Sequence, residues 1–484
     1  MPRNANLWAL ALLLLFSWAW TEPVHAAAKT APQPAEWPHF RGPTQQGVST
    51  EAGIPNAFPT EGLKQLWKAP VKSFPEGGHR LNGSPVAALG LVFFQTLLDS
   101  GRNEALFCFE LKDGRQLWTL TLNAAEGQGN GTPAVDSASG RIFACTSGGL
   151  AGNCDRVPAS VHCVDVRTGK EIWKITHQKL GLPANAAGSV TPLLFESMVI
   201  ITTNLKVFAL DKDTGAVRWS WPEKFPELNP NEVDGGKMSK EDYNKLDKKA
   251  IKKPFATSSP VIGDLGGKKV LAQSVRRVAD TGYCASTVLL DPKTGKQVGL
   301  LPWVGSHHMS LIADNLLINT VYDGDESYTA YSHPMNLAAY RPTWKGETLE
   351  MQEAWRVKGF ANRYTLCSGA VQNGKVYWRM GETLWCVEAA SGKVCWKQTG
   401  VMDQKHWPLT STIFADGKCF HVDEVGTLRI FQDQGGKAQV LLTQKVCGDT
   451  GSSPAIADGK LIVRDYAAGL SCFELKPSAP APKK

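Results

Sequence analysis

The chain has 484 residues, of which 43% are hydrophobic and 20% charged, and its formal net charge is +7. This composition excludes a disordered or membrane-embedded chain and is typical of a soluble protein with a sizeable core. Seven lysines against three acids between Lys237 and Lys253 supply over half of the positive excess, so no broad basic face is indicated and we exclude nucleic acid as a partner.

The N-terminus has the pattern of an export signal. Arg3 gives a basic start, an apolar run extends from Leu7 to Trp20, and small residues around Ala26 favour cleavage. The run is shorter than the ~20 residues that a bilayer-spanning helix needs, although a retained anchor stays open as an alternative. We predict a signal peptide over residues 1–26, with no cysteine nearby for lipid attachment, followed by a disordered linker over residues 27–36.

One seven-residue phrase recurs along the chain. It reads TGKEIWK at Thr168 and returns as DGRQLWT at Asp113, TGAVRWS at Thr214 and SGKVCWK at Ser391. In each copy apolar, β-prone residues precede a polar turn that ends in glycine, and a short strand that ends in tryptophan follows. This pattern predicts a β-hairpin whose turn needs glycine for a positive φ.

A second phrase, made of small residues followed by an apolar strand, opens each repeat unit. It reads GSPVAAL at Gly83, GTPAVDS at Gly131 and SSPAIAD at Ser452, with looser copies between them. Counting it gives eight units with a period of about 40–50 residues and four strands each, which predicts an all-β, eight-bladed β-propeller over residues 37–476. The last unit ends after three strands. We therefore predict that LKQLWKA at Leu63 supplies its fourth strand and closes the ring.

Tryptophan recurs at the same point of the outer strand. Because its ring buries a large apolar area and its indole N–H can donate a hydrogen bond, we interpret these residues as structural contacts between blades: Trp67, Trp118, Trp173, Trp219, Trp355 and Trp396. Unit four has Val298 and Gly299 at this point, and unit seven reads GGKAQVLL. These two joints should therefore pack differently.

Residues 222–256 form a polar, lysine-rich insertion, and residues 477–484 are expected to be a disordered tail. Within the insertion, NEVDGGKMSKED resembles a calcium-binding loop. In the register that fits its glycine, however, Val233 and Gly235 occupy ligand positions, so oxygen ligands are missing and we expect no calcium site.

The cysteines follow the repeat. Four of them occupy one column that Ala209 holds in another unit, which indicates a small buried side chain: Cys108, Cys163, Cys386 and Cys472. One pairing can be predicted. If the turn in CVEAASGKVC is symmetric, Cys386 and Cys395 lie directly across a hairpin and form a disulfide.

These units resemble the PQQ-binding-like, or quinoprotein-type, β-propeller repeat. The resemblance rests on LDKDTGAVRW from Leu210 to Trp219 and on the small-small-Pro strands. The opening WPHFRGPTQQGVS, from Trp37 to Ser49, also looks like the start of exported bacterial members. A closed eight-bladed ring is similar to the outer-membrane assembly factor BamB family and to quinoprotein dehydrogenases.

For the dehydrogenases, the resemblance implies pyrroloquinoline quinone (PQQ) on the ring axis, with calcium, a vicinal disulfide, a tryptophan platform and a catalytic aspartate. This chain has no adjacent cysteine pair. The axial ends of its repeats carry small residues instead: Ser84, Thr132, Ser259, Ser368, Ser411 and Ser453. We therefore predict no catalytic residue, no metal and no cofactor.

Six residues are candidates for ligand binding at the channel mouth. His307 and His308 fall where other units place small polar residues, but neighbouring residues on a strand point to opposite faces, so the pair does not easily bind one metal. The others come just before inner strands: Arg80, Asn362, Arg363 and Tyr364. Ordinary packing and ligand contact both remain open for the six.

We therefore expect a monomeric, non-catalytic scaffold, periplasmic or secreted and without a transmembrane span. It would bind a protein, glycan or small ligand of the cell envelope through its channel mouth and rim loops. Two alternatives remain. The first is an oxidoreductase that depends on PQQ with calcium, or on a metal, and the second is a purely structural assembly factor similar to BamB.

Overall fold

The computed structural model describes residues 34–71, 83–98, 103–124, 131–146, 149–150, 156–157, 159–182, 191–203, 206–222, 255–256, 258–279, 282–302, 304–305, 309–322, 335–361, 367–400, 402 and 409–476. The chain divides into two units, Met1–Pro34 and Ala35–Lys484. The fold concerns the second unit, whose described elements are all β-strands.

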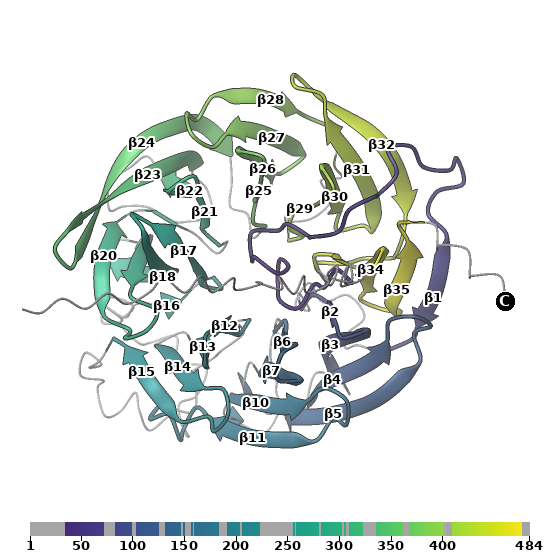
Figure 1. The fold of residues 1–484 in the computed structure, drawn as a ribbon, viewed down its shortest axis with the longest axis horizontal. Coiled ribbons are helices and arrows are strands. Elements are labelled where there is room, and N and C mark those ends of the chain that lie inside the picture. Colours follow the sequence, from purple (N-terminus) through teal and green to yellow (C-terminus); the bar gives the residue numbers. More distant parts are fainter. Residues whose placement is uncertain are drawn as a thin grey trace, which may run out of the picture. The chain divides into compact units, whose positions relative to one another are not determined.

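Eight antiparallel sheets stand around a ring, and each forms one blade whose first strand lies nearest the centre (Figure 1). The strands of the first four blades are: blade 1, β2 (Val86–Ala88), β3 (Leu91–Leu98), β4 (Asn103–Glu110) and β5 (Gln116–Ala124); blade 2, β6 (Ala134–Asp136), β7 (Arg141–Cys145), β10 (Ser160–Asp165) and β11 (Glu171–Thr176); blade 3, β12 (Leu193–Phe195), β13 (Met198–Thr202), β14 (Val207–Asp211) and β15 (Val217–Trp221); blade 4, β17 (Val261–Leu265), β18 (Lys268–Ala279), β19 (Gly282–Leu290) and β20 (Gln297–Pro302).

The second half of the ring repeats the arrangement, and its last blade takes β1 from the start of the chain. Its strands are: blade 5, β21 (Leu311–Ala313), β22 (Leu316–Tyr322), β23 (Met335–Lys345) and β24 (Thr348–Ala361); blade 6, β25 (Ala370–Gln372), β26 (Lys375–Met380), β27 (Thr383–Glu388) and β28 (Val394–Gln398); blade 7, β29 (Ile413–Ala415), β30 (Lys418–Val422), β31 (Thr427–Asp433) and β32 (Ala438–Lys445); blade 8, β33 (Ala455–Ala457), β34 (Lys460–Asp465), β35 (Gly469–Glu474) and β1 (Gln65–Ala69).

The predicted fold is confirmed: eight blades form a closed ring. Closure depends on β1, which pairs antiparallel with β35 and places Trp67 opposite Cys472. Two short additions lie outside the repeat. β8 (Gly149–Leu150) pairs with β9 (Arg156–Val157), and β16 (Phe255–Ala256), at the end of the predicted insertion, pairs with β18 as a fifth strand of blade 4. Residues 223–254 of that insertion lie outside the described residues.

The tryptophans of the repeat join neighbouring blades through one geometry. Each indole N–H donates to the next blade, over distances of 2.9–3.1 Å, with these acceptors: Leu111 O for Trp67, Val166 O for Trp118, Lys212 O for Trp173, Pro292 O for Trp219, Ala389 O for Trp355 and Asp433 Oδ1 for Trp396. At five of these joints the ring also covers the turn glycine of the next blade. A Cβ on Gly295, for example, would lie 2.5 Å from the Trp219 ring.

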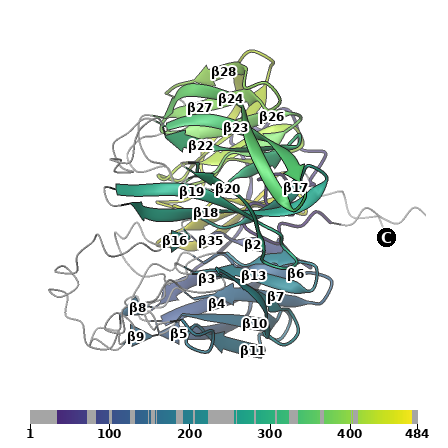
Figure 2. The same ribbon diagram turned by 90° about the vertical axis from the view of Figure 1, so that its left-hand side faces the viewer.

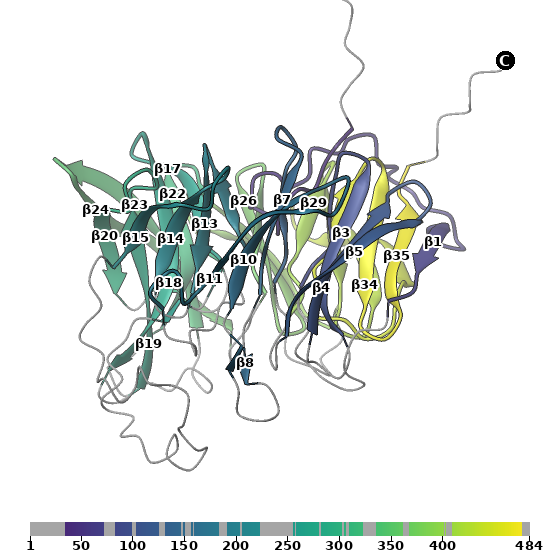
Figure 3. The same ribbon diagram turned by 90° about the horizontal axis from the view of Figure 1, so that it is seen from below.

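The alternating strand directions give the ring two unlike faces. The tight turns from first to second and from third to fourth strand all reach one face, which we call the turn face. The connections from second to third strand, and from each blade to the next, reach the other, which we call the loop face. Figure 3 shows the turn face uppermost and the loop face below, and Figure 2 shows β18 and β19 extending beyond the other strands on the loop face.

An N-terminal segment, residues 35–54, lies across the centre of the turn face (Figures 1 and 3). It pairs with the first strands of blades 1 and 7, which flank blade 8, through the bridges Trp37↔Ala87 and Val48↔Phe414. Its side chains hold the turns of blades 1, 2 and 8: Glu36 accepts from Leu89 N at 2.8 Å and from Ser137 Oγ at 2.6 Å, and Glu51 accepts from Gly459 N at 2.7 Å. One end of the ring axis is therefore covered by the chain itself.

Candidate functional site

The six predicted ligand-binding residues all belong to connections between blades. His307, His308, Arg80, Asn362, Arg363 and Tyr364 lie outside the described residues, so their role stays a prediction. The described strands that flank them reach the loop face. Within the described ranges, no group of three or more His, Cys, Asp or Glu side chains is placed to hold a metal ion.

Small polar residues at the start of five first strands bind one another, and Met309 of blade 5 joins them through its amide. The amides of Met309, Ser368, Ser411, Ser453 and Ser84 each donate to the hydroxyl of the equivalent residue in the next blade, over 2.9–3.0 Å, and the acceptors are Ser368, Ser411, Ser453, Ser84 and Thr132. We call these residues the hydroxyl belt. It runs through six blades and crosses the ring closure. These hydroxyls therefore hold the inner wall together.

A buried charge cluster lies between blades 6 and 7. The guanidinium of Arg379 binds both carboxylate oxygens of Glu424, at 2.9 and 2.8 Å, and lies 2.9 Å from His421 Nε2. Glu424 also accepts from Leu409 N at 2.8 Å. Burial holds the pKa of His421 well below its usual range, and the two nearby arginines lower it further. The cluster is a compensated ion pair that fastens two blades.

Blade 2 contains a serine, a histidine and a glutamate with the spacing of a catalytic relay. His162 Nε2 lies 2.7 Å from Ser160 Oγ, and His162 Nδ1 lies 2.7 Å from Glu171 Oε2. Such a relay activates a serine only when a substrate can reach the hydroxyl. Ser160 and His162 are 0% exposed, and Thr146 Oγ1 lies 3.1 Å from Ser160 Oγ. The relay therefore satisfies buried polar atoms inside the blade.

The cysteine column lies opposite the tryptophans. Strand pairing places Cys108 across from Trp118 and Cys163 across from Trp173, and these thiols are wholly buried. Burial raises the pKa of Cys108 and Cys163 to about 12, so both remain protonated at neutral pH. They are packing residues rather than nucleophiles.

The predicted symmetric turn between Cys386 and Cys395 is not what the structure contains. A β-bulge shifts the register after Cys386, so that Cys386 pairs with Trp396 and Val387 with Val394. Cys395 therefore lies beside the position directly across from Cys386. The disulfide itself stays a prediction.

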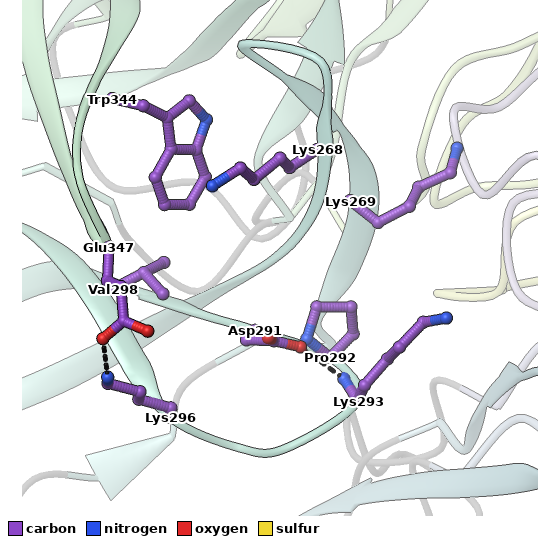
Figure 4. Close-up of a pocket in the computed structure, with 9 residues that line it drawn as sticks. All are labelled: Lys268, Lys269, Asp291, Pro292, Lys293, Lys296, Val298, Trp344 and Glu347. Atoms are coloured by element: carbon purple, nitrogen blue, oxygen red, sulfur yellow. Dashed lines mark hydrogen bonds and ion pairs between the residues drawn. The ribbon is translucent and has the colours of Figure 1, made fainter.

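Blade 4, which lacks the repeat tryptophan, has a surface pocket of about 310 Å³ (Figure 4). It is lined by Lys268, Lys269, Asp291, Pro292, Lys293, Lys296, Val298, Trp344 and Glu347. The four lysines are already engaged. Lys268 Nζ lies 4.0 Å from the centre of the Trp344 ring, and the others form ion pairs with Asp264, Glu196 and Glu347. The pocket is therefore the surface of an altered joint and does not offer free charge to an anion.

The described residues do not fit a PQQ–calcium centre. Calcium needs several carboxylate or amide oxygens that are free to converge on it. Near the belt, however, Glu424 binds Arg379 and Asp423 Oδ2 accepts from Arg429 at 2.6 Å. The belt hydroxyls are joined to their neighbours. We derive no reaction step through that cofactor.

Comparisons with known proteins agree with the fold. A family model described as "Outer membrane protein assembly factor BamB" matches residues 54–231 and, overlapping these, 157–298. None of the curated proteins compared matches the chain. In the described part of the chain, no helix is long and apolar enough to span a bilayer.

Three solved structures are similar to the chain at low identity. BamB from Moraxella catarrhalis is 15% identical with a TM-score of 0.51, over 84% of this chain and 99% of that one. Quinohemoprotein alcohol dehydrogenase from Comamonas testosteroni is 13% identical with a TM-score of 0.59, over 93% and 82%. The computationally designed Ika8 protein is 10% identical with a TM-score of 0.51, over 85% and 99%. At these low identities the solved structures show only that the fold is shared. The family model, in contrast, matches just over half of the chain and therefore shows the family. The chain therefore belongs to the family of PQQ-like β-propellers that the BamB model describes.

Proposed function

We propose that the protein is an exported, monomeric and non-catalytic scaffold that binds a protein, glycan or small ligand of the cell envelope at its loop face. The observation that carries this proposal is the difference between the two faces. The turn face has tight turns and is covered at its centre by residues 35–54. The loop face receives the long connections between strands, and such connections on a rigid scaffold are where binding residues concentrate.

The polar groups described in the interior are already bonded to one another or buried, which supports a binding function rather than a catalytic one. Arg379 and Glu424 neutralise each other, the Ser160 relay is buried, and the belt hydroxyls accept bonds from neighbouring blades. A catalytic group must instead have a free functional atom within reach of a substrate. Export is supported by the N-terminal pattern, and an envelope role agrees with the description of the matching family.

Site-directed photo-crosslinking in cells tests which face binds. The crosslinking residue is placed at Lys179 or Thr399, which are exposed on the loop face, and in matched controls at Lys112 or Arg167, which are exposed on the turn face. We expect adducts from the loop-face positions only, and these should persist after the envelope is washed. Equal labelling from both faces, or labelling from the turn face alone, would contradict the proposal.

Two further measurements separate the alternatives. PQQ and Ca²⁺ are added to the purified full chain, and we expect neither a shift of the quinone absorbance nor dye-linked alcohol oxidation; turnover would establish the oxidoreductase instead.

Cell fractionation with N-terminal sequencing tests export. We expect a chain that begins near Ala27 in the periplasm or medium, and a chain that keeps Met1 would contradict the proposed cleavage.

A further inference from the structure

Three arginines are wholly buried in the ring, and they differ in their partners. Arg379 forms the ion pair with Glu424. Arg464 donates to Gly83 O and to Thr96 Oγ1, both at 2.8 Å, and lies over the Phe94 ring. Arg41, in the N-terminal segment, is 0% exposed, and its Nε, Nη1 and Nη2 all lack a hydrogen-bond acceptor.

The backbone around Arg41 fixes the guanidinium inside the ring. Arg41 O accepts from Gly47 N at 2.9 Å, which closes a short loop, and Gly47 O accepts from Phe414 N of blade 7 at 2.7 Å. A Cβ on Gly47 would lie 3.0 Å from Arg41 Nη2, 3.0 Å from Ala370 Cβ and 3.1 Å from Thr412 O. The guanidinium therefore lies close to the inner strands of blades 6 and 7, where glycine leaves room for it.

An unpaired guanidinium in this position is costly. Burial lowers the pKa of Arg41 to about 9, but the group still carries its charge at neutral pH. A buried charge without a counter-charge is among the least favourable arrangements in a protein interior. Thr412 Oγ1, immediately before the first strand of blade 7, is likewise buried without a partner. Arg379 and Arg464 show that this chain otherwise supplies acceptors for its buried arginines.

We infer that Arg41 binds a small oxyanion, a carboxylate or a phosphate-type group, inside the ring beside the inner strands of blades 6 and 7. The planar guanidinium presents paired N–H donors that match two oxygens of such an anion. Thr412 Oγ1 provides a nearby hydroxyl donor. The site lies beneath the N-terminal segment at the covered end of the axis, so it is independent of binding at the loop face.

Thermal unfolding of the full chain in different anions tests the site. Because a buried site can retain an anion through purification, the protein is first unfolded in urea and refolded in chloride. Sodium acetate, sodium phosphate and sodium chloride are then titrated at equal ionic strength. We expect acetate or phosphate to raise the unfolding midpoint in a saturable way that chloride does not reproduce. Arg41→Met should abolish this response, and Arg41→Lys should weaken the apparent affinity by about tenfold because the paired donors are lost.

Matched controls separate binding from general effects of salt. Arg464→Met removes another buried arginine and should lower stability while it keeps the anion response, and Arg115→Gln removes an exposed one and should change neither. An equal anion response in the wild type and in Arg41→Met, or no response in the wild type, would overturn the inference and leave water as the partner of Arg41. If Arg41→Met does not fold, wild-type crystals grown with selenate decide: an anomalous peak within hydrogen-bonding distance of Arg41 supports the site, and its absence overturns it.

Discussion

The joints on the two sides of blade 4 meet the same need with different residues. Between blades 3 and 4, Trp219 on the outer strand donates to Pro292 O at 3.1 Å and covers Gly295 of the following blade. Between blades 4 and 5, Trp344 on the long hairpin of blade 5 donates back to Leu265 O at 2.9 Å and covers Gly266 of the preceding blade. Both joints thus contain an indole packed on a glycine turn. At the regular joint the tryptophan contacts the following blade, whereas at the reversed joint it contacts the preceding one.

The size of the residue paired with this position on the neighbouring strand depends on whether the tryptophan is present. Where the tryptophan is present, the residue opposite is small, as with Ala209 opposite Trp219. Where it is absent, the residue opposite is large: Leu289 faces Gly299 in blade 4, and Ile430 faces Leu442 in blade 7. Because a core must be filled to nearly constant density, the volume lost from one strand is restored by the other.

The largest expected effect comes from filling the glycine turn of the regular joint. Gly295 has a φ of +71°, and any side chain there meets the Trp219 ring. We expect Gly295→Val to lower the free energy of unfolding by about 3–5 kcal/mol, from backbone strain and overpacking together, and Trp219→Ala to lower it by a similar amount. Urea unfolding followed by fluorescence measures both changes.

The double variant sharpens this result. If the glycine and the indole act as one contact, Gly295→Val in a Trp219→Ala background has room for its side chain. The two losses should then be less than additive, by about 1–3 kcal/mol. Additive losses would show that the turn and the tryptophan stabilise the ring separately.

The reversed joint should be weaker but still tryptophan-dependent. Trp344 is only partly buried, so we expect Trp344→Ala to cost about 2 kcal/mol. Trp221→Ala is the matched control, because the Trp221 indole makes only a 3.3 Å bond to Gln297 Oε1, and it should cost less than half as much. Equal effects of the two substitutions would mean that Trp344 does not carry the joint.

The regular joints could be predicted from the sequence, and the reversed one could not. The phrase that ends in glycine and tryptophan repeats with a fixed offset, so its role follows from periodicity alone. Trp344 stands outside that register, in residues that appear in unit five only. The repeat shows that blade 4 needs a different joint, since Val298 and Gly299 replace the tryptophan, but it does not show which residue supplies it.

The same limit applies to the candidate site. The sequence places Ser84, Ser411 and their equivalents at the axial ends of the repeats, and the structure adds that they bind one another. The covering of the turn face by residues 35–54 depends on contacts across hundreds of residues, such as Glu51 with Gly459. No local pattern carries that information, so Arg41 could not be identified as a candidate beforehand.

The hydroxyl belt joins the blades at the axis, as the tryptophans do at the rim, and it should contribute less per joint. Ser411→Ala leaves the amide of Ser368 without its acceptor, and we expect a loss of about 1–2 kcal/mol in urea unfolding. Ser411→Thr keeps the hydroxyl that Thr132 supplies in blade 2 and should restore most of the stability. A threonine variant as unstable as the alanine variant would assign the loss to side-chain volume.

The smallest effect concerns the turn beneath Trp173, and it depends on pH. Asp211 accepts bonds from the Arg218 guanidinium above all, and also from Thr214 Oγ1 and Thr214 N; these bonds favour the charged carboxylate and lower its pKa to about 2. The pKa of Asp211 is thus lower in the folded state than the value of about 3.8 in the unfolded state. The bonds to this carboxylate therefore stabilise the fold fully at pH values above 3.8, and this contribution is lost as the pH falls towards 2. We expect Asp211→Asn to cost about 1 kcal/mol at pH 7 and almost nothing at pH 2. The matched control is Asp291→Asn in blade 4, where the carboxylate accepts from Lys293 N; it should lower the stability less than Asp211→Asn at every pH. If the loss caused by Asp211→Asn does not change with pH, the shape of the side chain rather than its charge stabilises the turn.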